Sequence, residues 1–364
     1  MLSMNKFKSI LKIIGIVLGA VVVLALAYVW YVVISYHRIE DHTKIAVSAP
    51  ISGVENDKAE AGEEYTILSY NIGFGAYSPD YTFFMDGGKS SWAESKESVL
   101  KLVNGSGDFV LSNDPDFVLF QEVDCDSTRS YHVDQTKILA EKFPEYDSTY
   151  ALNYDSPFLL YPILEPHGAS KAGVLTLSRF RISSCERRSL PISESLSKYI
   201  DLDRCYSVNR LPLKNGKELV LINLHLSAYG SSEEVRAGQT AMLREEMQKE
   251  YEAGNYVIAG GDFNHDLKLE TDDPALFWAH FYDRNLLPEH FSFAMDGLGS
   301  EKKQALSNTC RDAGVVYDPE TAYTVTVDGF IISDNIKCTY YENLENNYEF
   351  SDHNPVLMKF VLEE

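Results

Sequence analysis

The stretch Val257-Ile-Ala-Gly-Gly-Asp-Phe-Asn-His265 decides the fold. A short apolar run gives way to two glycines, and Asp262 and Asn264 follow where the run ends. If Tyr256–Ala259 is a buried strand, its period of two points Asp262 and Asn264 the same way and turns Phe263 toward the core. The glycines suit a backbone bend or the close approach of a ligand. An ordinary strand-to-loop turn, with acid and amide bound to local backbone amides, explains the tripeptide equally well.

Apolar runs of strand length recur along the chain and alternate with helical patterns. We expect helices at Trp92–Val103, at Asp134–Phe143, and from the capping pattern Ser231-Ser-Glu-Glu234 to about Ala253. The further strands are expected at Tyr65–Tyr70, Asp116–Phe120, Gly173–Ser178, Glu218–Leu224, Val325–Ile332 and Val356–Phe360. No linker interrupts this alternation, which predicts one domain of mixed α and β structure.

Polar side chains with chemical capability stand at or just past the ends of these strands. They are Asn71, Glu122, His225, Asp262 with Asn264, Asp328, and Asp352 with His353. Strand ends on one edge of a sheet converge, and clefts form there in layered proteins. Each residue alone has an ordinary structural explanation as a core histidine, a cap or a turn. Their joint occurrence favours one site.

The composition of this set indicates the chemistry of the site. Carboxylates and amides without a thiolate suit Mg²⁺, Mn²⁺ or Ca²⁺ better than structural zinc. Two histidines beside such a metal are suited to proton transfer and to contact with a phosphate. The five cysteines are far apart and form no CxxC pair, which excludes a zinc ribbon and gives no sign of a disulfide framework, although single bridges remain open.

The net charge of the chain limits its partners. Lys and Arg total 32 against 54 for Asp and Glu, a net charge of −22 in 364 residues. Such a surface repels polyanions, so nucleic acid is a disfavoured partner unless a local basic patch forms. The sequence predicts no protein partner.

The N-terminal segment has the pattern of a membrane anchor. Residues 1–12 carry three lysines, and the segment 13–36 begins with 23 residues without a charge, enough to span a bilayer. The lysines predict a cytoplasmic N-terminus, so the protein is expected to be a single-pass cell-membrane protein with its catalytic domain outside. A cleaved signal peptide, with Ala25-Leu-Ala27 as cleavage site, is the alternative. Residues 37–64 are polar and are expected to form a stalk, and residues 65–364 are expected to form the catalytic domain.

Six short motifs resemble those of the endonuclease/exonuclease/phosphatase superfamily. This superfamily includes pancreatic-type deoxyribonucleases, AP endonucleases, neutral sphingomyelinases and inositol polyphosphate 5-phosphatases. The motifs are Ile67-Leu-Ser-Tyr-Asn71, Phe120-Gln-Glu122, Asn223-Leu-His225, Gly261-Asp-Phe-Asn264, Val327-Asp-Gly-Phe-Ile331 and Ser351-Asp-His353. The resemblance to a membrane-anchored, bacterial-type member spans Tyr65 to Leu362. It implies an α+β fold, a four-layer sandwich of two packed mixed β-sheets with helices outside, and a divalent-metal phosphoesterase.

The resemblance also implies roles for the motif residues. Glu122 should hold the metal, normally Mg²⁺, with Asn71 and Asp352 beside it. Asp262 and Asn264 should orient the attacking water and the phosphate. The two histidines should bracket the phosphorus: His225, and His353 polarised by Asp328. The sequence leaves open which histidine is the base.

Four further residues are candidates for contact with the substrate. His167 and Lys171 precede the Gly173 strand, where relatives often place such groups, and Arg129 and Arg204 supply cations that reach toward a phosphate. An exposed loop and ordinary surface or paired arginines are the competing explanations. The anchor and the acidic charge favour a phosphodiesterase acting on a phospholipid headgroup or small phosphodiester. An extracellular nuclease is the alternative, and a catalytically silent binding module is the third.

Overall fold

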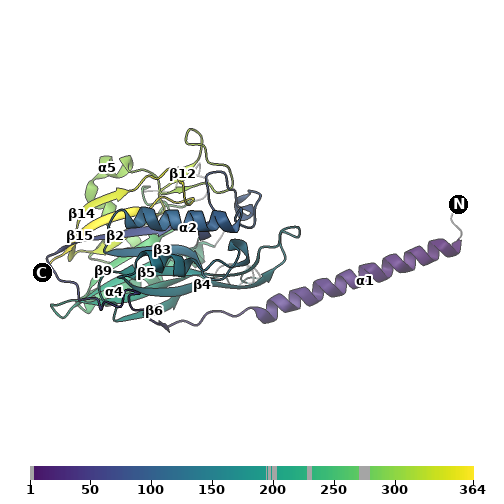
Figure 1. Ribbon diagram of the computed structural model, residues 1–364, viewed down its shortest axis with the longest axis horizontal. Coiled ribbons are helices and arrows are strands. Elements are labelled where there is room, and N and C mark those ends of the chain that lie inside the picture. The colour runs from purple at the N-terminus through teal and green to yellow at the C-terminus, as the bar shows by residue number, and fades with distance from the viewer. Residues whose placement is uncertain (1–3, 194, 196–197, 199–202, 228–231, 270–278) are drawn as a thin grey trace.

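The computed structural model describes residues 4–193, 195, 198, 203–227, 232–269 and 279–364. Figure 1 shows a layered domain from which one long helix projects. The helices are α1 (Met4–Ser35), α2 (Lys96–Leu111), α3 (Gln135–Lys142), α4 (Glu233–Glu252) and α5 (Ser300–Ala305). The strands are β1 (Thr43–Ile45), β2 (Glu64–Asn71), β3 (Phe117–Asp124), β4 (Asp147–Leu159), β5 (Gly168–Ser178), β6 (Ser184–Ser189), β7 (Cys205–Pro212), β8 (Glu218–His225), β9 (Tyr256–Asp262), β10 (Phe291–Phe293), β11 (Cys310–Arg311), β12 (Thr324–Val325), β13 (Asp328–Ser333), β14 (Ile336–Asn343) and β15 (Val356–Leu362).

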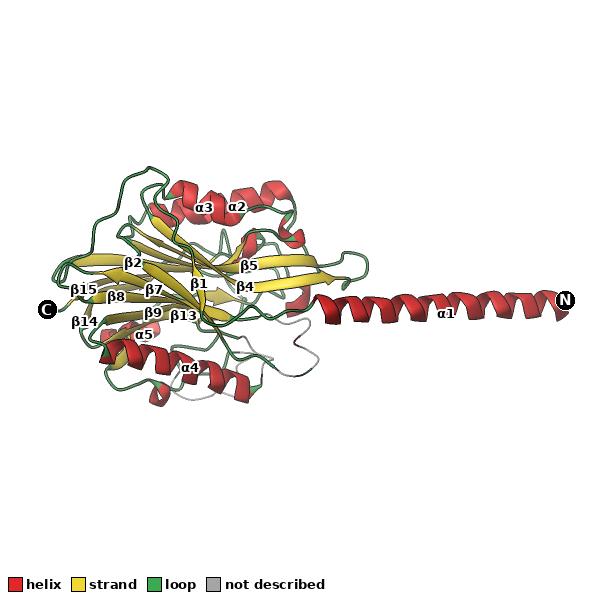
Figure 2. Cartoon of the chain, turned by 90° about the horizontal axis from the view of Figure 1, so that it is seen from below, coloured by secondary structure: helices red, strands yellow, loops and turns green. Residues whose placement is uncertain are grey.

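Two large mixed sheets form the centre of the domain. The first has the strand order β1-β6-β7-β8-β9-β13-β10 and the second β14-β15-β2-β3-β5-β4. Figure 2 shows α2 and α3 outside one sheet and α4 and α5 outside the other. The predicted four-layer arrangement of two packed mixed sheets between helices is therefore confirmed.

The core lies between the two sheets and explains why the central strands are almost wholly apolar. Leu119 of one sheet and Ile258 and Phe330 of the other belong to one fully buried cluster. Each such side chain contributes roughly 1.5–3 kcal/mol on burial. A second cluster, with Val99 and Leu139, packs the helices α2 and α3 against the outside of their sheet.

Two parallel strand pairs bring the chemically important strand ends to one edge. β2 runs parallel to β3, and β8 runs parallel to β9. β13 is antiparallel to β9, so its first residue, Asp328, lies beside the last residue of β9, Asp262. The carboxyl ends of four strands and the start of a fifth therefore meet in one place.

The structure extends several predicted elements and adds others. The strand expected to end at Phe120 continues through Glu122, and the helix expected from Trp92 begins at Lys96, behind the N-cap Ser95. α4 begins behind the N-cap Ser232, while the Ser231 of the predicted capping pattern lies outside the described residues. The strands β4, β6, β7 and β14 were not predicted.

The N-terminal helix α1 is the one described helix long and apolar enough to cross a membrane. Within its segment Lys6–Ser35, an 18-residue window has a mean hydropathy of 2.8 and no buried residue, whereas Val32, near the domain, is buried. In both views it points away from the sheets.

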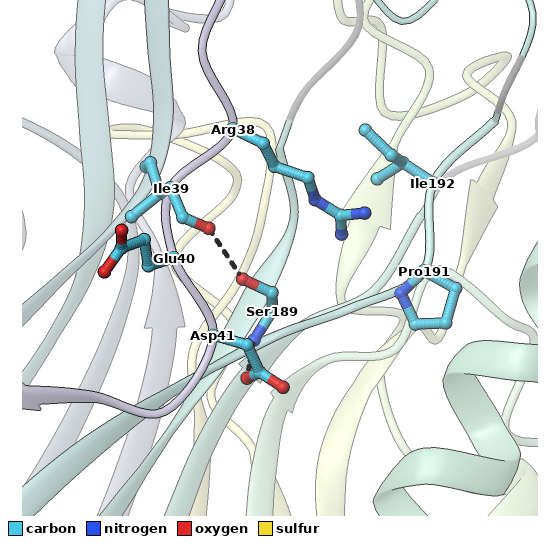
Figure 3. Close-up of a pocket in the computed structure, with 7 residues that line it drawn as sticks. All are labelled: Arg38, Ile39, Glu40, Asp41, Ser189, Pro191 and Ile192. Carbon is cyan, nitrogen blue, oxygen red and sulfur yellow. Dashed lines mark hydrogen bonds between the residues drawn. The ribbon is translucent and has the colours of Figure 1, made fainter.

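The residues that follow α1 lie against the domain. β1 pairs with β6 at the edge of the seven-stranded sheet. Arg38 Nε donates to Asp203 Oδ1 at 2.9 Å, and Ser189 Oγ donates to the carbonyl oxygen of Ile39 at 2.9 Å. Figure 3 shows Arg38, Ile39 and Ser189 around a hollow of about 480 Å³ that is also lined by Pro191. The stretch expected as a stalk contacts the domain beyond β1 as well, since Ser48 bridges to Ser148 and the buried Ala59 bridges to Leu213.

Candidate active site

The strand ends bring an amide, two carboxylates and an imidazole into direct proximity. Asn71, at the end of β2, donates through Nδ2 to Asp262 Oδ2 at 3.0 Å and to Glu122 Oε1 at 3.4 Å. His225, at the end of β8, places Nε2 at 3.4 Å from Asp262 Oδ2 and 3.9 Å from Glu122 Oε1. Four residues from four strands, spread over nearly 200 positions of sequence, therefore share one centre.

An irregularity in β3 sets the position of Glu122. The register between β3 and β5 shifts between Phe120 and Val123, and Glu122 has a φ of 53°. Such a bulge redirects a side chain relative to the regular strand. Gln121 fixes the bulge from the other side, because its Nε2 donates to Asn223 Oδ1 of the facing sheet at 2.8 Å. Glu122 remains partly exposed at the centre while its neighbour is buried.

The carboxyl end of β9 requires the glycine that the sequence places there. Gly261 has a φ of +141°, and a Cβ at this position would collide with the carbonyl oxygen of Leu224 on β8. Phe263 turns into the core as predicted. Asn264 has a φ of 51°, its backbone N–H donates to Asp262 Oδ1 at 2.8 Å, and its side-chain Nδ2 donates to the carbonyl oxygen of Leu226 at 2.9 Å.

Asp328 and His353 form a buried carboxylate–imidazole pair next to Asp262. His353 Nδ1 lies 2.7 Å from Asp328 Oδ2, and its Nε2 lies 3.9 Å from Asp262 Oδ2. Burial opposes a charge on the ring, but Asp328 outweighs it and holds the pKa of His353 well above its usual range. Thr309 fixes the backbone at Asp328, since its Oγ1 accepts hydrogen bonds from the backbone N–H groups of Val327 and Asp328.

The turn before β15 joins this pair to the end of β2. Ser351 Oγ donates to the carbonyl oxygen of Asn71 at 2.8 Å and contacts Asp352 Oδ1 at 3.2 Å. Asp352 closes over Gly73, which has a φ of +50°; a Cβ there would lie 2.8 Å from Asp352 Oδ1. The sequence motifs contain Ser351 and Asp352, whereas nothing local to Gly73 or Thr309 indicates that they shape the site.

The electrostatics of the centre are those of crowded negative charge. Burial, followed by repulsion from Asp328, raises the pKa of Asp262 to about 7. Burial and Asp352 raise the pKa of Glu122. Burial, with Arg204 as the next cause, holds the pKa of His225 well below its usual range, so this ring is neutral. The carboxylates are therefore costly to ionise together, and a cation among them would relieve that cost.

The donor set fits a hard divalent cation. Glu122, Asp262 and Asp352 offer carboxylate oxygens at the centre, and oxygen is the ligand that Mg²⁺ prefers. Asn71 turns its Nδ2 toward Glu122 and Asp262, while its Oδ1 accepts the backbone N–H of Gly73. Within the described ranges, Asp262, Asp328 and His353 also form a group close enough to hold a metal ion. His353 is less suited to that role than the carboxylates, because Asp328 raises the pKa of the ring against the opposing effect of burial and so keeps a proton on Nε2. Asp328 Oδ1 and His225 Nδ1 are buried without a hydrogen-bond partner among the described residues, so two polar atoms of the site are available to a ligand.

Residues 68–286 match the model of the endonuclease/exonuclease/phosphatase family. The chain belongs to this family. Members of the endonuclease/exonuclease/phosphatase family hydrolyse phosphoester bonds and use divalent metal ions. A comparison with curated protein sequences finds no match.

Solved structures of the endonuclease/exonuclease/phosphatase family share the fold. The chain is similar to an endonuclease/exonuclease/phosphatase from Beutenbergia cavernae DSM 12333, with a TM-score of 0.56, 17% identity, and coverage of 82% of this chain and 72% of that one. A family protein from Bacteroides vulgatus gives a TM-score of 0.52 at 16% identity, covering 83% and 100%. D. rerio TDP2, complexed with a single-stranded DNA product, gives 0.52 at 15% identity, covering 82% and 99%.

The four residues predicted to contact substrate separate into two groups in this endonuclease/exonuclease/phosphatase domain. Arg129 is buried, binds Asp124 through Nε and Nη2 at 3.1 and 2.9 Å, and lies over the ring of Phe74. Arg204 is also buried, and both arginines lie close enough to Glu122 to oppose the rise in its pKa that burial and Asp352 cause.

The contacts of His167 and Lys171 are with other groups. His167 is buried against Phe83 and Phe84, and burial, followed by Arg129, lowers its pKa to about 3. Lys171 has 48% of its side chain exposed, and its Nζ lies 3.9 Å from Asp155 Oδ2. Substrate contact stays a prediction for all four residues, and the positions of Arg129 and Arg204 favour it more.

Proposed function

We propose that this protein is a membrane-anchored, Mg²⁺-dependent phosphodiesterase that acts outside the cell membrane on a phospholipid headgroup or a small phosphodiester. The observation that carries the phosphoesterase assignment is the meeting of Asn71, Glu122, His225, Asp262 and the Asp328–His353 pair at one sheet edge. That set combines oxygen ligands with two imidazoles in different protonation states. Phosphoryl transfer mainly requires such positioning and neutralisation of charge.

The proposed metal ligands are Glu122, Asn71 and Asp352, with Mn²⁺ or Ca²⁺ as alternatives to Mg²⁺. When bound, the metal ion supplies positive charge that stabilises the negative charge developing on the phosphate. Burial, followed by repulsion from neighbouring carboxylates, raises the pKa of Asp262 and of Glu122, and this supports a cation at this place.

The other side chains of the site orient the attacking water and bind the phosphate. Asp262, with Asn264 bonded to it, accepts a hydrogen bond from the attacking water and orients it. His353, kept protonated by Asp328, donates through Nε2 to a phosphate oxygen and neutralises its charge. His225 is neutral and donates a hydrogen bond from the other side of the centre.

The proposed substrate class follows from charge and from the position of α1. A net charge of −22 disfavours long polyanions. His37, two residues beyond α1, lies 3.5 Å from Asp155 on the hairpin that continues from the site edge, so α1 leaves the domain near that edge. Lysines before the apolar segment support a cytoplasmic N-terminus and an external domain.

The second candidate function is cleavage of DNA or RNA. Its support is the structural similarity to TDP2, which has been solved with a single-stranded DNA product. Buried Arg129 and Arg204 beside Glu122 supply local positive charge that works against the overall acidity.

The test is a substrate comparison with the full chain in phospholipid nanodiscs. Release of headgroup phosphate from sphingomyelin and glycerophospholipids is measured beside cleavage of plasmid DNA and of inositol phosphates, each with Mg²⁺ and with chelator. We expect chelator-sensitive turnover of a phospholipid or small phosphodiester. Cleavage of DNA without lipid turnover would show that the protein is a nuclease instead, and inactivity on every substrate would favour a binding module.

Two histidine variants link that activity to this site. His225→Ala and His353→Ala should each lower the rate on the order of 10²-fold or more. His132→Ala is the matched control, because His132 also lies near a carboxylate, Asp126, but is exposed. Normal turnover in both site variants would refute the mechanism.

A further inference from the structure

An uncharged segment, Pro157–Leu164, forms the tip of the β4–β5 hairpin and is called the hairpin tip here. Its sequence is Pro-Phe-Leu-Leu-Tyr-Pro-Ile-Leu. Leu164 is 98% exposed and Ile163 is 84% exposed, the two highest values for large apolar side chains in the described part of the chain. Tyr161 is 71% exposed. Contiguous exposed apolar side chains indicate a surface that another apolar phase covers.

The rest of the hairpin is fixed, so the exposure is imposed by the fold. Ser91 Oγ donates to the carbonyl oxygen of Glu165 at 2.5 Å, and Trp92 Nε1 donates to that of Pro166 at 2.7 Å. The backbone N–H of His167 donates to the carbonyl oxygen of Tyr161 at 3.2 Å and closes the turn. These contacts hold the base of the hairpin and leave Ile163 and Leu164 without cover.

The hairpin tip contacts α1 within its uncharged segment. The backbone N–H of Phe158 donates to Tyr31 Oη at 3.1 Å, and the N–H of Leu160 donates to Tyr28 Oη at 2.9 Å. Figures 1 and 2 both show the end of the β4–β5 hairpin projecting on the side from which α1 leaves the domain. The two apolar elements therefore lie side by side.

The depth of this contact follows from helix geometry. Tyr28 precedes the end of α1, Ser35, by seven residues, which at about 1.5 Å per residue is about 10 Å along the axis. Tyrosines near the end of an apolar helix mark the boundary between hydrocarbon and headgroups. If α1 spans a bilayer, the hairpin tip hydrogen-bonded to Tyr28 and Tyr31 lies at that boundary.

We propose that the hairpin tip inserts into the outer leaflet beside α1 and gives the domain a second contact with the membrane. The match of an eight-residue uncharged tip to the interfacial zone, about 5–10 Å deep, supports a lipid bilayer as the partner. The proposal rests on α1 as a membrane span and is independent of the substrate.

Insertion would also orient the catalytic centre. At the carboxyl end of β3, Asp124 pairs with Ala172 of β5, and the hairpin continues outward from there. Glu122 lies in the same part of β3, so the hairpin projects from the edge that carries the site. With the tip in the leaflet, that edge faces the membrane surface.

The experiment uses the full chain, reconstituted in phosphatidylcholine vesicles with and without bromine-labelled acyl chains. Ile163→Trp places an indole on the hairpin tip. Ile51→Trp is the matched control, because Ile51 is also an exposed isoleucine, at 62%, and lies near the opposite end of β4. Fluorescence is measured as the difference from the wild-type chain, which has three tryptophans.

We expect the indole of Ile163→Trp to emit at shorter wavelength and to lose at least about half of its intensity to brominated lipid, as a group at interfacial depth does. Ile51→Trp should show neither change. Adding Leu164→Glu to Ile163→Trp should abolish the quenching, since a carboxylate resists transfer to the interface. Equal quenching of both indoles, or of neither, would refute insertion of the tip. Because no turnover is measured, a chain inactive on every phosphoester would leave this result interpretable.

Discussion

Replacing Asp328 by asparagine removes the charge that holds His353 protonated while keeping the side chain's size. The pair is buried, with 2.7 Å between Asp328 Oδ2 and His353 Nδ1. At an effective dielectric constant of about 20, unit charges about 4 Å apart interact by about 4 kcal/mol. About 1.4 kcal/mol of transition-state stabilisation corresponds to a factor of ten in rate, so losing the whole interaction between the two charges in the transition state would slow the reaction by about 10³-fold. Part of the interaction is already present in the ground state, so we expect a loss of about 10²-fold.

The pH profile separates this role from a purely structural one. Burial opposes the charge on the ring, and Asp328 raises the pKa of His353 above its usual value despite that. Without Asp328, the imidazolium should lose its proton at lower pH, and the alkaline limb of the rate profile should move to lower pH. The stability supplied by the pair is complete below the unfolded pKa of about 6.5 and is lost as the pH rises through the folded value. Asp328→Asn should therefore destabilise the fold more at pH 6 than at alkaline pH.

The same strand provides the control. Asp334, just beyond the other end of β13, lies 2.7 Å from His290 Nδ1, but this second pair is exposed. Asp334→Asn should leave the rate and the pH profile unchanged, because water screens an exposed pair. The assay is turnover of the preferred phosphoester from pH 5 to 9, with thermal unfolding measured on the same samples. If Asp328→Asn matches Asp334→Asn in rate and profile, the role given to the buried pair is wrong.

Three further perturbations test other parts of the centre. Glu122→Gln should raise the Mg²⁺ concentration for half-maximal activity by about 10-fold or more, measured by metal titration, and an unchanged requirement would exclude Glu122 as a ligand. Gly73→Ala would press a Cβ against the Asp352 carboxylate at a positive φ and should lower both turnover and melting temperature, whereas Gly297→Ala, with no atom within 4 Å, should lower neither. Burial raises the pKa of Asp262 to about 7, so the stabilising contribution of Asp262 in the metal-free protein is lost as the pH rises through that value. Asp262→Asn should therefore flatten the dependence of stability on pH between pH 5 and 8, measured by thermal unfolding. An unaltered dependence would contradict the raised pKa of Asp262.

The central sheets were predictable because their strands are buried on both sides. β8 and β9 each contain a nearly continuous apolar run in the sequence, and the apolar side chains of both strands are buried in the core. β4 and β7 were missed because polar residues interrupt them. Asn209 of β7 and Thr149 of β4 hydrogen-bond across the two sheets at 2.5 Å, so a polar layer lies where an apolar pattern was expected. Whether a buried polar residue finds a hydrogen-bond partner depends on the neighbouring strand, and the periodicity of its own strand does not show this.

The candidate site was predictable to the extent that its residues end apolar strands. His225 and Asp262 do so, and the structure places them 3.4 Å apart. Gly73 shapes the site through a contact with Asp352, which follows about 280 positions later, so no local pattern reports it. His167 is a different case, since its nearness in sequence to the Gly173 strand suggested substrate contact, the structure shows its ring buried against Phe83 and Phe84, and the contact stays a prediction.

If α1 spans the membrane, as proposed, the connection from the membrane to the domain is short, and this constrains the substrate. Seven residues separate the end of α1 at Ser35 from the start of β1 at Thr43, which span at most about 25 Å when extended. The actual span is smaller, because Arg38 Nε and the backbone N–H of Ile39 both bind the carboxylate of Asp203. A domain held this close to a bilayer by α1 would reach headgroups by lateral diffusion, whereas a DNA duplex would be repelled by a net charge of −22. Lengthening the segment before Arg38 should therefore reduce turnover of lipid in nanodiscs and leave turnover of a soluble phosphodiester unchanged. Equal loss on both substrates would show that the short connection serves the fold and not access to the membrane.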